Sequence, residues 1–204
     1  MKVSMNSAEK RSRHWLLLRQ KGIATVEMAL IFPLIAMMAF GIIDFGRLIQ
    51  ARLIVTNLAR EGGSLASRDV QSTPSLVTML QQGGTPLNMV AGGKIYIWKI
   101  RAGTSAANPE PFIDMTSSAS GGALGVGSSI GSGQTNLGLT PALFHHLEFD
   151  RAHQSSDIGD VTVVEVYYNY IPITPFSQII TLFFPGSAAI LPDTGQIISS
   201  RAVF

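Results

Sequence analysis

The longest apolar run in the chain lies near its amino terminus, directly after a basic segment. Residues Met28–Ile43 carry no charged side chain, and the apolar run from Ile23 to Ile43 holds a single acidic residue, Glu27. As a helix rising ~1.5 Å per residue, these 21 residues would be ~32 Å long, enough to cross the hydrocarbon core of a bilayer. The pattern therefore predicts a transmembrane helix over residues 23–45.

The helical pattern continues past the apolar run. Its apolar face is formed, at spacings of three and four, by Phe45, Leu48, Ala51, Val55 and Leu58, and its polar face by Arg47, Gln50, Asn57 and Glu61. The spacing predicts a helical extension over residues 46–63 whose apolar face packs on a globular domain. The helix is expected to end near Arg60, with Gly62-Gly63 as the stop, and Asp44 is expected to pair with Arg47 on its surface.

Residues 64–204 have the mixed periodicity of a small α+β domain. A short helix is expected to begin at Thr73, as its N-cap, and to end at Gly83-Gly84. Alternating residues predict strands at 94–101, 161–171 and 196–204, with Arg201 favouring an edge position for the last strand. The predicted fold class is α+β, with the long amino-terminal helix packed on a small antiparallel sheet.

Other parts of this domain have weaker patterns. In the strand at 161–171, the face that carries Val164 and Val166 is expected to be the buried one. The Gly/Ser-rich residues 116–138 contain too few apolar side chains to offset the entropy of ordering, so a mobile loop is expected there. A helical turn is expected at 143–149. The apolar segment 177–184 is expected to lie as a helix on the sheet or on a membrane surface.

Charge is distributed unevenly along the chain. Six basic residues precede Gly22, and the rest of the chain holds nine basic and twelve acidic residues. Because basic flanks stay on the cytoplasmic side, the leader predicts a single-pass protein with a cytoplasmic amino terminus and an external carboxyl-terminal domain. The pI of 9.1 therefore does not indicate a nucleic-acid partner. The chain has no cysteine, which excludes disulfides, thiol catalysis and cysteine-ligated zinc.

Glu27 is the unusual residue of the predicted span. A carboxylate at the centre of a membrane helix costs about 2.5–3.5 kcal/mol on insertion scales, and less near an end. Glu27 lies near the cytoplasmic end of the run, so the cost is reduced but still requires a compensating interaction. We expect a positively charged partner for this side chain.

The residues around Glu27 carry a family resemblance. Gly22 precedes Glu27 by five positions, after a basic leader and at the head of an apolar helix, and this resembles the processing site of type IV prepilins and pseudopilins. The following residues, IDFGRLIQARLIVTNLAREGG (Ile43–Gly63), resemble the TadE-like pseudopilins of the Tad (Flp) tight-adherence pilus system. Met28 departs from Flp-type sites, which often carry an aromatic residue after the glutamate. The resemblance covers about Gly22 to Gly63.

The resemblance implies a minor pilin or pseudopilin of Tad pilus assembly, in adhesion or secretion, with the lollipop layout of pilin-like subunits. The leader, residues 1–22, would be cut off between Gly22 and Ile23 by a prepilin peptidase. The new amino group would then pair with Glu27 of a neighbouring subunit. The implied partners are the bacterial inner membrane, the peptidase, other pilin or pseudopilin subunits and the Tad assembly platform, with the domain 64–204 in the periplasm. The resemblance does not distinguish TadE from its relative TadF. It also does not specify whether the protein lies in the pilus fibre, at its tip or at its base.

Two other interpretations of the apolar run remain. The first is an unprocessed membrane-anchored periplasmic scaffold of a secretion or pilus machine, in which Glu27 faces a partner helix. The second is a secretory signal peptide that is removed whole. Its hydrophobic region would be about 7–15 residues long and would end at a small-x-small site. The nearest such site, Ala39-Phe40-Gly41, lies inside the apolar run rather than at its polar edge.

Motifs for catalysis or ligand binding are weak, and we expect no enzymatic activity, no cofactor and no nucleotide site. Gly127–Gly131 matches G-x-S-x-G but lies in Gly/Ser loop, whereas the nucleophile elbow needs a preceding strand and a following helix. Gly92-Gly93-Lys94 lacks phosphate-loop spacing and is expected to be a turn. A polar cluster could bind a divalent ion, but it matches no zinc spacing and is explained by a solvated loop. The cluster is His145, His146, Glu148, Asp150, His153, Asp157 and Asp160.

Overall fold

The computed structural model describes residues 7–175 and 195–204, with side chains described from Ala24 onward. The chain divides into two compact units, which are considered separately. The first comprises the chain up to Gly46 with a segment that begins at Ile173, and the second begins at Arg47 and includes the carboxyl-terminal strand. The apolar segment 177–184 lies outside the described residues.

The first element, α1 (Ser7–Ser67), is one helix of 61 residues that continues through Pro33. Within the second unit its buried face includes Ala51, Val55 and Leu58, as the spacing predicted. The predicted polar positions, from Arg47 to Glu61, are exposed. Phe45, which was placed on the apolar face, is exposed instead.

The predicted end of α1 near Arg60 is wrong, because the helix continues through Gly62-Gly63 to Ser67. The two glycines allow close packing rather than stopping the helix. A Cβ at Gly62 would lie 2.7 Å from Leu80 Cδ1 and 3.2 Å from Val164 Cγ1. A Cβ at Gly63 would lie 2.3 Å from the ring of Phe204, the last residue of the chain. Glycine is thus favoured at position 62 by its lack of a side chain, because Leu80 is buried, whereas the ring of Phe204 beside Gly63 is exposed.

Substituting Gly62 tests this packing. Alanine raises helix propensity by about 1 kcal/mol, but overpacking a filled core costs about 1–3 kcal/mol. We expect Gly62→Ala to be destabilising by about 1 kcal/mol, measured by thermal unfolding of the full chain in detergent. Gly46→Ala in the same helix is the matched control, because no atom lies within 4 Å of a Cβ there. Equal melting temperatures for the two variants would contradict the packing role of Gly62.

The second unit is built on an antiparallel sheet in the order β2-β1-β4-β5, with β3 pairing with β1. The strands are β1 (Gly93–Arg101), β2 (Phe112–Ile113), β3 (Ala119–Gly121), β4 (Asp160–Tyr170) and β5 (Gln196–Val203). The three predicted strands correspond to β1, β4 and β5, and β5 lies at the edge, as Arg201 indicated. The sheet and the long helix confirm the predicted α+β fold class.

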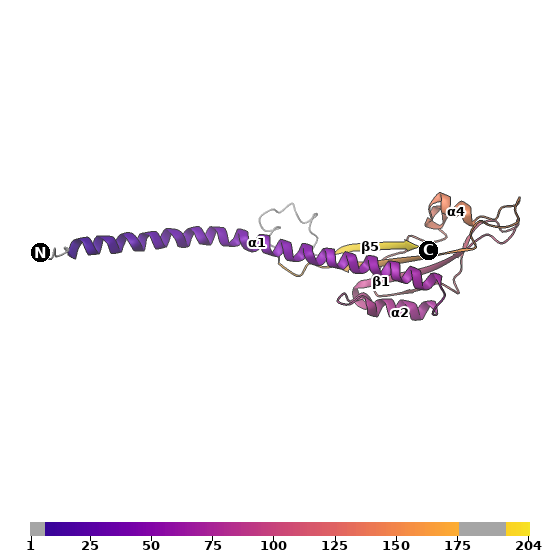
Figure 1. Cartoon of the computed structure of the whole chain (residues 1–204), viewed down its shortest axis with the longest axis horizontal. Coiled ribbons are helices and arrows are strands. Elements are labelled where there is room, and N and C mark those ends of the chain that lie inside the picture. Colours follow the sequence, from indigo (N-terminus) through magenta and orange to yellow (C-terminus); the bar gives the residue numbers. More distant parts are fainter. Residues whose placement is uncertain (1–6, 176–194) are drawn as a thin grey trace. The chain divides into compact units, whose positions relative to one another are not determined.

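Helices cover one face of this sheet. The carboxyl-terminal part of α1, together with α2 (Thr73–Gly83), packs on Ile95 and Ile97 of β1 and on Val164 and Val166 of β4. Figure 1 shows α2 beside this part of α1. The N-cap of α2 is Ser72 rather than Thr73, whose hydroxyl donates to the carbonyl of Ser117 instead. The short helix α3 (Met89–Gly92) leads directly into β1, in place of the predicted turn at Gly92-Gly93.

The Gly/Ser-rich segment 116–138 covers the other face, so the expectation of a mobile loop is wrong. Its first part forms β3, and its later part leads through η1 (Thr135–Gly138) to α4 (Pro141–Leu147), which corresponds to the predicted turn at 143–149. Ile130 is buried with Ile100 of β1 and Val163 of β4. Tyr96 and Trp98 also donate hydrogen bonds to this segment, at Val126 O and Ser128 Oγ. The sheet therefore supplies the apolar area that the segment itself lacks.

A turn at residues 114–117 ties the beginning of this segment to β1. Asp114 accepts hydrogen bonds from the Thr116 hydroxyl at 2.6 Å and from Arg101 Nε at 2.7 Å. These two donors hold the pKa of the Asp114 carboxyl well below its usual range. Since the carboxylate form is favoured in the folded state, Asp114 contributes stability above the pKa of the unfolded chain, and this contribution is lost as the pH falls below it.

The pH dependence of Asp114→Asn follows from this sign. At pH 7 the variant is expected to melt at a lower temperature than the wild type, because Asn cannot pair with the Arg101 cation. Below pH ~3.9, the ordinary aspartate pKa, the unfolded wild type takes up a proton that the folded form resists, so the difference should shrink. Melting curves of both proteins between pH 2 and pH 7 measure this difference in melting temperature. A difference that does not change with pH would contradict the role given to Asp114.

Candidate functional site

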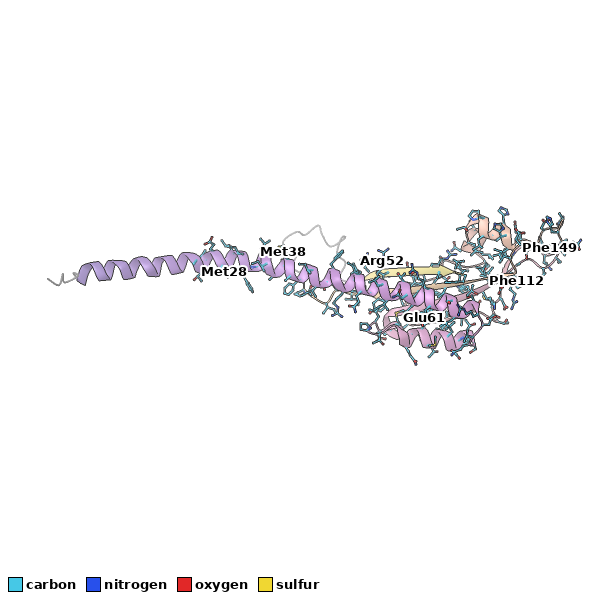
Figure 2. The ribbon with its side chains drawn as sticks, viewed as in Figure 1. Met28, Met38, Arg52, Glu61, Phe112 and Phe149 are labelled. Carbon is cyan, nitrogen blue, oxygen red and sulfur yellow. The ribbon has the colours of Figure 1, made fainter. Side chains whose placement is uncertain are left out.

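Between Ala24 and Ile35, α1 has its side chains exposed on every face, whereas Ala36, Met37 and Phe40 further along the apolar part are half-buried. Leu30, Ile31, Phe32 and Leu34 are all exposed, and successive helical residues point about 100° apart. Figure 2 shows Met28 and Met38 projecting from the same helix. Among the described residues, one helix, Ala24–Ser67, is long and apolar enough to span a membrane. A helix that is hydrophobic on all faces requires an apolar environment around it, and nothing in the described protein supplies one along this stretch.

The residues predicted to act in processing and assembly lie on this helix. Gly22 and Ile23 are in α1, which is continuous across the bond between them. Glu27 is exposed, and its side chain makes no hydrogen bond or ion pair with the part of the chain that the structure describes. All three residues therefore lie on one helix, which the sequence predicted for Ile23 and Glu27. Their roles remain predictions, since the geometry shows only an exposed acid at the start of an exposed apolar helix.

Asp44, the first charged residue after the apolar run, was expected on the surface beside Arg47, and this is wrong. It is only 8% exposed, and it binds a distant segment. Its Oδ1 accepts hydrogen bonds from the backbone N–H groups of Ile173 and Thr174, both at 3.3 Å, and its Oδ2 accepts one from the Thr174 hydroxyl. No pattern in the sequence links residues about 130 positions apart, so this contact was not predicted.

Glu165 is the second buried acid that the sequence prediction missed. It lies on β4 and is 1% exposed, on the strand face that was expected to be open. Both faces of β4 are buried, because the Gly/Ser-rich segment covers the one with Glu165. The carboxylate accepts hydrogen bonds from the hydroxyls of Ser128 and Ser129 and from the Ser129 N–H, the last at 3.2 Å. A charge in the core is tolerated when it is paired or fully hydrogen-bonded.

The hydrogen bonds around Glu165 give the G-x-S-x-G sequence at residues 127–131 a structural role. The two serines donate to Glu165, and Ser128 also accepts from Trp98 Nε1 at 2.7 Å. No strand precedes them and no helix follows directly, so the geometry of a nucleophile elbow is not formed. Burial, and secondarily the charge of Glu165, raises the pKa of Tyr96 on β1 and of Tyr167 on β4. The hydrogen bonds around Glu165 fix the loop to the sheet.

The polar cluster between His145 and Asp160 separates into pairs. His145 pairs with Glu148, His146 with Asp157, and His153 with Asp150. Asp150 raises the pKa of His153, chiefly through a side-chain hydrogen bond, and His153 lowers the pKa of Asp150 in the same way. In residues 24–175 and 195–204, no three His, Asp or Glu side chains converge as metal ligands would. The pairs are exposed and serve as a solvated surface.

Comparison with known protein families gives a match for part of the chain. Residues 22–64 match the model of the TadE-like protein family, which is about a fifth of the chain. This confirms the resemblance stated from the sequence, and the matched residues include Gly22, Ile23 and Glu27. No curated protein and no solved structure matches the chain.

Proposed function

Taking residues 22–64 as a TadE-like segment, we propose that the chain is a minor pilin or pseudopilin that takes part in Tad (Flp) pilus assembly. The observation that carries this proposal is that the matched segment includes a helical stretch, residues 24–35, whose apolar side chains are exposed on all faces. Such a helix can lie in a bilayer before assembly and among the helices of other subunits afterwards. The role is structural, without catalysis or a cofactor.

The proposed topology follows from the charge distribution. Residues 1–22 form a basic cytoplasmic leader, 23–45 span the bacterial inner membrane once, and 46–63 continue the helix into a periplasmic domain, 64–204. The six basic residues before Gly22 support this orientation, because basic flanks are retained on the cytoplasmic side. The partners we propose are the inner membrane, other pilin or pseudopilin subunits and the Tad assembly platform.

We further propose that a prepilin peptidase cuts between Gly22 and Ile23. The new amino group would carry a positive charge at the membrane surface, close to the acid that needs a cation. Intact mass and amino-terminal sequencing of the protein extracted from membranes test this directly. A chain that begins at Ile23 in cells with the peptidase, and at the leader in cells without it, is the expected result.

The alternative is an unprocessed, membrane-anchored periplasmic scaffold of a pilus or secretion machine. The continuity of α1 across Gly22 and Ile23 favours it, because a peptidase would have to unwind the helix to reach the bond. A mature chain that keeps residues 2–21 in cells with an active peptidase would support the scaffold and overturn the processing step. Gly22→Ile is a useful variant, since a β-branched side chain at the cleavage position should prevent cutting without changing the span.

A further inference from the structure

The segment Pro172–Pro175 has an unusual backbone, because none of its residues presents a free N–H group. Pro172 and Pro175 have no N–H, and the N–H groups of Ile173 and Thr174 both donate to Asp44. The Thr174 hydroxyl donates to the same carboxylate. Backbone that contacts lipid must have its donors satisfied within the protein, since hydrocarbon offers no acceptors. The segment therefore meets a condition for lipid contact that an ordinary surface loop does not.

The side chains around this contact are apolar and exposed. Ile173 and Phe45 are each 63% exposed, and Ile42 and Ile43 of α1 are exposed beside Asp44 in the sequence. Asp44 itself is nearly buried, at 8% exposed. The N–H donors of this segment thus bond to one carboxylate, while the apolar side chains of Ile173 and of the neighbouring part of α1 are exposed.

The position of Asp44 along α1 sets the depth of the site. Asp44 directly follows the 21-residue apolar run, whose length of ~32 Å matches the ~30 Å hydrocarbon core of a bilayer. With that run in the membrane, Asp44 lies at the boundary between hydrocarbon and headgroups. Ile173, whose backbone nitrogen lies 3.3 Å from Asp44 Oδ1, is held next to this boundary.

We propose that residues 172–175 form a second membrane contact, in which Ile173 enters the lipid surface beside α1 while Asp44 satisfies the segment's N–H groups. The occupant of this apolar surface is the bilayer itself, because the surface continues the exposed face of the span. The inference rests on the proposed membrane anchoring of α1. It adds that the chain returns to the membrane after the sheet strand β4 and is fixed there by one carboxylate.

Single-cysteine labelling tests the proposal, since the chain has no cysteine of its own. The full chain is purified with Ile173→Cys, labelled with the polarity-sensitive fluorophore NBD and reconstituted into phosphatidylcholine–phosphatidylglycerol vesicles. Doxyl-labelled lipids, with the nitroxide either near the headgroup or deep in the acyl chain, act as quenchers. We expect a blue-shifted emission at Ile173→Cys and at least twofold stronger quenching by the shallow nitroxide than by the deep one.

Two control positions separate the inference from the anchoring on which it rests. Leu34→Cys, in the middle of the span, should be quenched more strongly by the deep nitroxide, and Val90→Cys, which replaces an apolar side chain 60% exposed in the second unit, should not be quenched. Quenching at position 34 with none at position 173 overturns the second contact and leaves the anchor intact. No quenching at either position overturns the anchor as well.

The role of Asp44 is tested in the same assay. Asp44→Ala in the Ile173→Cys background removes the acceptor of three hydrogen bonds and leaves two backbone N–H groups without a partner. We expect the quenching of the label at position 173 to fall at least twofold, while a label at position 34 is quenched as before. Unchanged quenching at position 173 would overturn the role of Asp44 in holding the segment at the membrane.

Discussion

The Glu27→Gln variant is expected to enter the membrane normally but to assemble into no pilus. Gln is nearly isosteric with Glu, and loss of the charge makes insertion of the helix easier rather than harder. In the assembled state, however, the proposed amino group at Ile23 of a neighbour would lose its counter-charge in a low-dielectric environment. Leaving one member of a buried ion pair unpaired costs about 3–5 kcal/mol, or a factor of about 10² to 5 × 10³ at each subunit contact.

Pili in the culture supernatant and the amount of the variant in the membrane fraction measure assembly and insertion separately. Glu61→Gln is the matched control, because Glu61 is an exposed acid on the same helix, outside the apolar run. It should leave assembly unchanged. Normal pili from Glu27→Gln would show that the pairing role is wrong, whereas failure of both variants would point to a general requirement for charge on α1.

Glu165→Ala is expected to have the largest effect on the stability of the second unit. The substitution removes the acceptor of three hydrogen bonds from Ser128 and Ser129 and leaves a cavity under the Gly/Ser-rich segment. Hydrogen bonds to a charged group contribute about 1.5–3 kcal/mol, and the cavity adds to the loss. We expect about 3 kcal/mol of destabilisation, which lowers the melting temperature by about 10 °C in a domain of this size.

Thermal unfolding and hydrogen exchange of the full chain in detergent measure this effect and its location. Amides in residues 122–139 should lose protection first, because Glu165 is the point at which they are fixed to β4. Glu110→Ala, at an exposed acid in the same unit, should change the melting temperature by less than about 1 °C. A small effect of Glu165→Ala, equal to that of the control, would show that the apolar contacts of Ile130 suffice to hold the segment.

The sequence by itself determined the elements that depend on local pattern. The 21-residue apolar run and the spacings of three and four beyond it specified α1, because helical periodicity and length are properties of neighbouring residues. The strands β1, β4 and β5 followed from alternation in the same way. The Gly22–Glu27 spacing and the residues up to Gly63 were enough to identify the TadE-like segment.

Only the tertiary structure decided which polar and small residues are buried. Glu165 is buried because a segment about 36 residues earlier in the chain covers it, and Asp44 is buried because the chain returns to it about 130 residues later. From the sequence, Gly62-Gly63 were predicted to end the helix. In the structure the helix continues through them, and Leu80 and Phe204 occupy the space where their side chains would be. Local patterns record the preference of each residue for water or for a backbone conformation. Burial of a charge or a glycine depends instead on which distant groups satisfy or fill the space beside it, and that is fixed only when the chain has folded.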